Sequence, residues 1–319
     1  MNIKKISSIT RKVGPILNTN ENSSQVSIKK IIQQHPDTNR PISDDGITTI
    51  ELSNLENSYD IPEPHLMQPL NEVLTPEQID ALNDKINNAV KEAGPGTGEA
   101  VSAAIKALIE GLREYGITLP YYLGGGHEGI GNGIYNGVDP TWGQETVASG
   151  YTTDRYYNSL DCTGLLLWAT RNAGITLPAP YEPVNPNDMN TGHIMDITQS
   201  CHKIDVREAK PEDIEPGDIV VNEEHVIIIL DSYTNENGEL VLVTAESSPS
   251  EDSSGQVPIP GEEINLEGPY TGGVHIQEYT ASEMWDNMYL ADDYPDEPVM
   301  ITSMSELYML NRTSNQKEV

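Results

Sequence analysis

The sequence predicts an α+β domain whose helices come before an antiparallel β-sheet. Two amphipathic stripes within residues 76–115 predict a pair of helices. Short apolar runs after residue 217, two of them joined by Asn237-Gly238, predict strands and a hairpin. Helices followed by consecutive strands are typical of an antiparallel sheet, because parallel strands need long crossover connections.

The first predicted helix covers about residues 76–92 and has a clear start signal. Thr75 can cap it, Pro76 suits the first helical position, and Gln78 completes a capping box. A second helix is predicted over about residues 98–115, after a break rich in Gly and Pro. The apolar residues of each helix fall on one stripe, and we expect them to be core: Ile79, Leu82, Ile86 and Val90, then Val101, Ile105, Leu108, Ile109 and Leu112.

The remainder of the domain divides into irregular segments and strands. Residues 121–160 and 175–217 are rich in Gly and Pro and are predicted to be irregular. Between them, a short apolar helix is predicted to begin at Asp161-Cys162 and to end at Gly174, a residue suited to a helix C-terminus. Strands are predicted over about residues 218–221, 225–233, 240–247 and 273–279.

Residues 1–74 differ in composition from the rest of the chain. They are rich in Asn, Ser, Gln and Pro and show no sustained helical or alternating pattern. So little apolar surface cannot compensate for the entropy lost on ordering, which predicts a weakly ordered N-terminal extension. A tether, a propeptide and a docking signal are alternative roles for it. Residues 75–319 are predicted to form one domain, with a helical lead-in over 75–117 and a C-terminal tail over 281–319.

The chain is strongly acidic, with 50 Asp and Glu, 18 Lys and Arg and a formal net charge of −32. Nucleic acid and acidic lipid surfaces are therefore disfavoured as partners, because binding them needs basic side chains. No apolar run approaches the roughly 18 residues that a membrane span requires. The apolar part of the N-terminal stretch is also shorter than that of a signal peptide. We expect any export to use another route, and a cytoplasmic location is the alternative.

Cys162 is the candidate nucleophile. It lies at the predicted start of a helix, where unpaired N–H groups and partial positive charge favour thiolate over thiol and can hold an oxyanion. The second cysteine of the chain is Cys201, and two cysteines are too few for a disulfide-built scaffold. A disulfide between Cys162 and Cys201 remains an alternative that would block the thiol.

A nucleophilic cysteine needs a base and a third group that orients the base. His225 is the best candidate base, because it opens the apolar strand HVIIIL just after a polar turn. Glu246 lies on the strand that the Asn237-Gly238 hairpin pairs with the strand of His225. Thr244, on the same predicted face as Glu246, is the alternative third group.

Several motifs, in order, resemble the NlpC family of bacterial cell-wall cysteine peptidases. They are YYLGGGHEG, GVDPTWG, LDCTGLLLWATRNAG, EPGDIV with EEHVIIIL, and TAESS with GGVHI. The resemblance covers roughly residues 115–280. It implies a papain-like core, in which a helix bearing the cysteine packs on an antiparallel sheet bearing the histidine. It further implies hydrolysis of amide bonds in peptidoglycan stem peptides, typically the bond after γ-linked D-Glu.

The resemblance also implies roles for individual residues. Cys162 matches the nucleophile of an Asp-Cys-Ser-Gly motif, here with Thr163 in place of Ser. His225 matches the histidine that follows a Pro-Gly-Asp turn. The third polar position varies in this family and is matched best by Glu246, whereas a shift of the alignment by two residues would give Thr244.

The expected substrate contacts surround the cysteine. Tyr121 matches the tyrosine of a Tyr-x-Trp-Gly-Gly motif, which lies near the nucleophile and can touch the substrate. Leu123 replaces the usual Trp of that motif, which leaves the shape of the groove open. Gly125, His127 and Asp161 are the other residues expected at the substrate, although His127 could instead lie on the surface without a role.

The proposed chemistry needs no metal or organic cofactor, and the histidines show no paired ligand spacing such as HxxxH. A peptidoglycan peptide is the expected substrate, reached by secretion, by a non-classical route or by lysis. Two alternatives remain. One is a thiol enzyme that uses a thioester to transfer a group to a protein or to deamidate a protein. The other is a non-catalytic component of a phage or secretion particle. The oligomeric state is left open.

Overall fold

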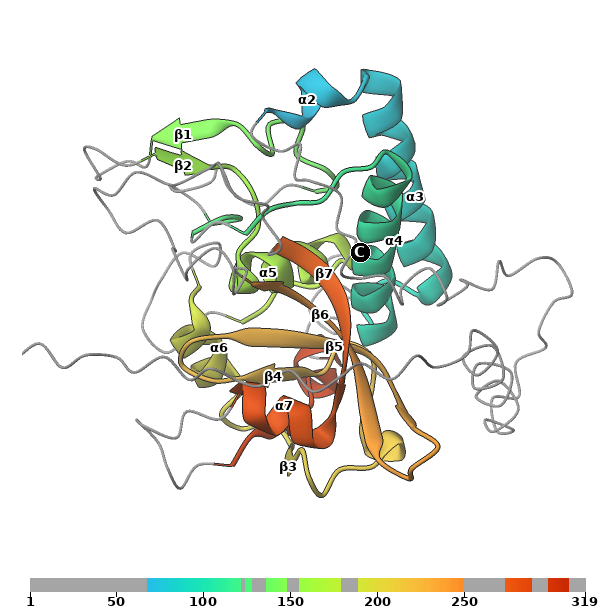
Figure 1. Ribbon diagram of the computed structural model, residues 1–319, viewed down its shortest axis with the longest axis vertical. Helices are drawn as coiled ribbons and strands as arrows, with labels where there is room; N and C mark the ends of the chain where they lie inside the picture. Colours follow the sequence, from blue (N-terminus) through green and yellow to red (C-terminus); the bar gives the residue numbers. More distant parts are fainter. Residues whose placement is uncertain are drawn as a thin grey trace, which may run out of the picture. The chain divides into compact units, whose positions relative to one another are not determined.

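The computed structural model describes the following residues of the chain: 68–121, 124–127, 136–147, 155–178, 189–248, 273–288 and 298–309. This part has several helices and a six-stranded antiparallel sheet (Figure 1). The predicted α+β class with an antiparallel sheet is therefore confirmed. Most of the predicted extension and parts of the predicted tail lie outside the described residues, namely 1–67, 289–297 and 310–319.

The helical lead-in follows the sequence patterns closely. Helix α3 (Pro76–Ala93) begins with the predicted capping box, in which Thr75 Oγ1 accepts from the Gln78 amide at 3.3 Å and Gln78 Oε1 accepts from the Thr75 amide at 2.8 Å. Helix α4 (Gly98–Glu114) packs against α3. The predicted apolar stripes are buried in both helices, so they form core as expected.

The sheet has the strand order β3-β8-β4-β5-β6-β7. Each pair of neighbours in it is antiparallel. The β5–β6 hairpin turns at the predicted Asn237-Gly238, where Gly238 has a φ of 82°, a left-handed conformation that glycine adopts readily. The strands are β3 (Lys203–Asp205), β4 (Ile219–Val221), β5 (Val226–Thr234), β6 (Leu240–Ser248), β7 (Gly273–Thr280) and β8 (Met300–Thr302).

Several short elements were not predicted, among them α2 (Leu70–Val73), β1 (Glu145–Val147), β2 (Arg155–Tyr157), α6 (Thr191–Ile197), β3, α7 (Ala281–Met288) and β8. Of these, β1, β2, α6 and β3 lie in segments that were expected to be irregular. Three-residue strands are too short to show an alternating pattern, which explains why they escape sequence analysis. Helix α2 falls within the predicted extension, and its Leu70 is fully buried. Packed structure therefore begins before Thr75.

The two faces of the sheet carry different helices, α5 (Cys162–Asn172) and α7 (Figure 1). On one face, Ile227, Ile229 and Leu242 form a buried cluster with Met284 and Met288 of α7. The opposite face of β5 and β6 contacts α5, and β5 also contacts α4. Within the described ranges, none of the helices has both the length and the apolar character that a membrane crossing requires.

The first turn of α5 packs directly on the glycine-rich loop 124–127. Asp161 caps the helix, since its Oδ1 accepts from the Gly164 amide at 2.7 Å. Its Oδ2 accepts from the Gly124 amide at 2.8 Å, and its own amide donates to the Gly125 carbonyl at 3.0 Å. A Cβ at Gly164 would lie 2.0 Å from that carbonyl oxygen. Only glycine at this position lets the loop and the helix approach so closely.

We predict that Gly164→Ala lowers the free energy of unfolding by about 2 to 3 kcal/mol, because the new methyl group collides with backbone that cannot rotate away. Urea denaturation followed by circular dichroism measures this change. Gly192→Ala is the matched control, also near the start of a helix, where the nearest atom to the new Cβ is the Asn190 side-chain oxygen at 3.3 Å. The control is expected to change stability by less than about 1 kcal/mol. Equal effects of the two variants would contradict the close-approach argument.

Candidate active site

Cys162 is the first residue of α5, directly after the capping Asp161. Its side chain is buried, with 6% exposed. The predicted setting at a helix N-terminus is therefore present in the structure. Cys162 and Cys201 are both free cysteines, so the alternative disulfide between them is absent.

His225 is held by the turn between β4 and β5. Asn222 Oδ1 accepts from the amides of Glu224 at 2.9 Å and His225 at 2.7 Å. The Asn222 amide group in turn donates to the carbonyl of Met288 at the end of α7, at 2.9 Å. These contacts fix the backbone that carries the imidazole.

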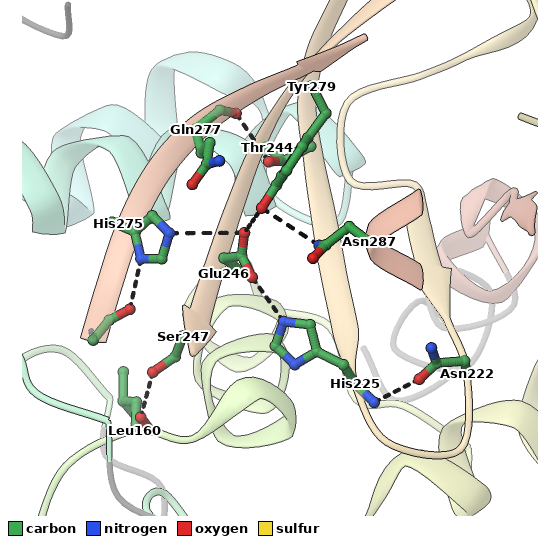
Figure 2. Close-up of polar contacts among 11 residues, drawn as sticks. Leu160, Asn222, His225, Thr244, Glu246, Ser247, His275, Gln277, Tyr279 and Asn287 are labelled. Atoms are coloured by element: carbon green, nitrogen blue, oxygen red, sulfur yellow. Dashed lines mark hydrogen bonds and ion pairs between the residues drawn. The ribbon is translucent and has the colours of Figure 1, made fainter. Parts of the chain in front are cut away.

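Glu246 lies next to His225, on the neighbouring strand (Figure 2). The Nε2–H of His225 donates to Oε2 of Glu246 at 2.8 Å. Cys162 is close enough to the imidazole to help raise its pKa. His225 therefore lies beside both the thiol of α5 and the carboxylate of β6.

Thr244, the alternative third group, does not reach the imidazole. Its hydroxyl donates to the backbone carbonyl of Gln277 on β7, at 2.9 Å (Figure 2). The structure therefore brings Glu246, and not Thr244, to His225. The catalytic role of Glu246 stays a prediction.

The electrostatics of the site favour a charged imidazole. Burial by itself lowers the pKa of His225, but hydrogen bonds and negative charge from Cys162 and Glu246 outweigh it and raise the pKa to about 10. For Glu246 burial acts in the opposite direction and raises the pKa. The contacts with His225, His275 and Tyr279 outweigh this effect and hold the pKa below its usual value. The arrangement therefore favours an imidazolium next to an ionised carboxylate.

Asp161, His127 and Thr163 form a buried polar cluster under the first turn of α5. His127 Nε2 lies 3.0 Å from Asp161 Oδ1 and 2.9 Å from Thr163 Oγ1. The Thr163 hydroxyl donates to the same Asp161 oxygen at 3.0 Å. His127 is only 5% exposed, so the alternative of a surface position for it is wrong.

Three of the residues expected to contact a substrate help to hold the glycine-rich loop against the start of α5. Asp161 uses both carboxylate oxygens to hold the loop and the helix, while Gly125 contributes its carbonyl to the same junction. His127 is bonded to Asp161 and buried with it. Contact of these residues with a substrate stays a prediction.

Tyr121 lies near Cys162. Burial, together with the charges of Cys162 and Asp161, raises the pKa of its phenol. The hydroxyl therefore keeps its proton and can donate a hydrogen bond to a substrate. Leu123, which replaces a Trp in the matched motif, lies outside the described residues.

Two residues of the site were missed by the sequence analysis, and both come from β7. His275 is the direct cross-strand partner of Glu246, with its Nε2 3.7 Å from Glu246 Oε1 and its Nδ1–H donating to the Gly273 carbonyl at 2.8 Å. Tyr279 donates its hydroxyl to the same Oε1 at 2.6 Å. The period of two in β7 places both on one face, but the pairing register with β6 was needed to bring them to Glu246.

Comparison of the chain with models of protein families, with curated protein sequences and with solved structures gives no significant match. Over the described ranges, no group of three or more His, Cys, Asp or Glu side chains is arranged to hold a metal ion.

We predict that His225 keeps its second proton up to about pH 10 and that Glu246→Gln lowers its midpoint, because the amide removes the negative charge beside Nε2. Titration of the ¹⁵N-labelled imidazole by NMR measures the midpoint. Thr244→Val serves as the control, since its hydroxyl bonds Gln277 and not His225. An unchanged midpoint in Glu246→Gln, or an equal fall in Thr244→Val, would contradict the assignment.

Proposed function

We propose that the protein is a cysteine endopeptidase that hydrolyses amide bonds in peptidoglycan stem peptides, at the bond after γ-linked D-Glu. The observation that carries the proposal is the placement of His225, which bonds Glu246 at 2.8 Å and lies close enough to Cys162, at a helix N-terminus, for Cys162 to help raise its pKa. A thiol, an imidazole and an orienting carboxylate in this order are the parts of a nucleophilic acyl-transfer site.

A papain-like core is part of this proposal. Helix α5, which bears Cys162, contacts β5 and β6, and the antiparallel sheet that contains them carries His225 and Glu246. That arrangement supports the expected packing of the cysteine helix on the histidine sheet. The choice of peptidoglycan as substrate rests on the resemblance of the motifs to the NlpC family.

The proposed mechanism has two stages. The Cys162 thiolate attacks the amide carbonyl carbon, and the N–H groups at the start of α5 are placed to stabilise the oxyanion that forms. The His225 imidazolium gives its Nδ1 proton to the departing amine as the C–N bond breaks, which leaves a thioester. His225 then takes a proton from water, which attacks the thioester and releases the carboxylic acid and Cys162. Glu246 remains ionised and keeps the imidazole oriented.

The charge of the chain favours one second candidate. A formal net charge of −32 repels a polyanionic cell wall, which argues for a substrate other than the intact wall. A thiol enzyme that transfers a group to a protein, or that deamidates a protein, would form the same kind of thioester on Cys162. The complete Cys162, His225 and Glu246 set argues against a particle component without turnover. For the peptidase we propose delivery to the wall by a non-classical route or by lysis.

The decisive experiment incubates the full-length protein with soluble peptidoglycan fragments under reducing conditions and analyses the products by mass spectrometry. We expect new free amines and the masses of shortened stem peptides, and complete loss of both in Cys162→Ala. Cys201→Ala is the matched control, because Cys201 is also buried and free but lies among the charges of Glu306, Lys203 and Asp218. It is expected to retain activity. If the unaltered protein releases no product, the peptidoglycan proposal fails and protein substrates become the leading class.

A further inference from the structure

The two oxygens of the Glu246 carboxylate have different partners. Oε2 accepts from His225 at 2.8 Å, while Oε1 accepts from the Tyr279 hydroxyl at 2.6 Å (Figure 2). His275 also faces Oε1, with its Nε2 at 3.7 Å, which is beyond hydrogen-bond distance. Tyr279 therefore supplies the short contact to the oxygen that His225 does not use.

We propose that Tyr279 is a positioning residue, whose hydroxyl fixes Oε1 of Glu246 so that Oε2 stays aligned on the His225 imidazole. The inference rests on the proposed function only in taking Cys162 and His225 as the reactive pair. It extends that function by adding a fourth side chain to the site.

The burial of Glu246 makes this contact important. Its side chain is 3% exposed, and a buried carboxylate is strongly destabilised unless its oxygens are hydrogen-bonded. A glutamate also has several rotatable bonds, so a single contact at Oε2 leaves the carboxylate free to turn. Without the Tyr279 hydroxyl, the remaining group at Oε1 is His275, whose attraction pulls the carboxylate toward β7 and away from His225.

The Tyr279 hydroxyl donates to Glu246, because an ionised carboxylate can only accept. Asn287 of α7 makes a longer contact from the other side, with its side-chain N–H 3.5 Å from the Tyr279 oxygen (Figure 2). The polar contacts thus run from α7 through β7 and β6 to His225, whose pKa Cys162 of α5 helps to raise. The groups that face Glu246 in this network are His225, His275 and Tyr279.

The test measures the rate at which iodoacetamide alkylates Cys162 as a function of pH, in the full-length protein with Cys201→Ser as background. This reaction needs no substrate. With Tyr279→Phe we expect the rate below neutral pH to fall about fivefold, because an imidazolium that is held less firmly by Glu246 stabilises the attacking sulfur less well. On peptidoglycan fragments we expect kcat to fall about tenfold with KM unchanged, because orientation of His225 matters in the transition state.

Tyr233→Phe is the matched control. Its hydroxyl donates to a carboxylate of the same sheet, Glu278 Oε2 at 3.1 Å, but at the opposite end of β5 from His225. The control removes an equivalent hydrogen bond and is expected to leave both the alkylation profile and kcat unchanged. If the loss of any tyrosine hydroxyl from the sheet had a general effect, Tyr279→Phe and Tyr233→Phe would lower the alkylation rate and kcat equally. That result would contradict the proposal.

A second variant covers the case in which Tyr279→Phe fails to fold. Asn287 is exposed, so Asn287→Asp can be made without disturbing the core. The new carboxylate competes for the Tyr279 proton, and we expect a smaller fall in alkylation in the same direction. An alkylation profile identical to that of the background in both variants would overturn the role of Tyr279. Absence of peptidoglycan cleavage with altered alkylation would refute the substrate and leave the positioning role supported.

Discussion

The burial of a charged carboxylate beside an imidazole is the constraint on which the rest of the site depends. Glu246 reaches His225 only because β6 pairs with both β5 and β7 in a defined register, which the Asn237-Gly238 turn begins to set and which shifts between Ile229 and Asp231 of β5. A slip of one residue would bring Ser247 to this face and send Glu246 to the α5 side. Since an unpaired buried charge is strongly destabilising, the wrong register is disfavoured by the same contacts that build the site.

Neighbouring residues of β6 connect the sheet to the start of α5, where Cys162 lies. Ser247 points to the face opposite Glu246 and donates its hydroxyl to the carbonyl of Leu160 at 2.7 Å, just before the capping Asp161 (Figure 2). Glu246 holds the imidazole from the other face. Ser247 and Glu246 are adjacent in β6. One short stretch of backbone therefore holds both the start of α5 and the imidazole of His225. The glycine loop and Asp161 then fix the orientation of Cys162 relative to it.

Much of this arrangement could be predicted from the sequence, because it depends on local signals. The capping box at Thr75, the helix start at Cys162 and the hairpin at Asn237-Gly238 are each encoded within a few residues. The β7 contribution could not be predicted, since the approach of His275 and Tyr279 to Glu246 depends on a long-range register. The supporting position of Asp161 was also unexpected, because an acid next to a nucleophile suggests a substrate contact until both of its oxygens are seen to be used.

The protonation states that favour the proposed chemistry are also those that stabilise the fold. The folded-state pKa of His225 is raised from 6.5 to about 10, so its contribution to stability is complete below about pH 6.5 and is lost as the pH rises through about 10. The folded-state pKa of Glu246 lies below 4.5, so its contribution is present above that value and is lost as the pH falls through the folded pKa. Between these limits the imidazolium and the carboxylate are both charged. The charge states that stabilise the buried pair are therefore the same ones that the proposed acid catalysis by His225 needs.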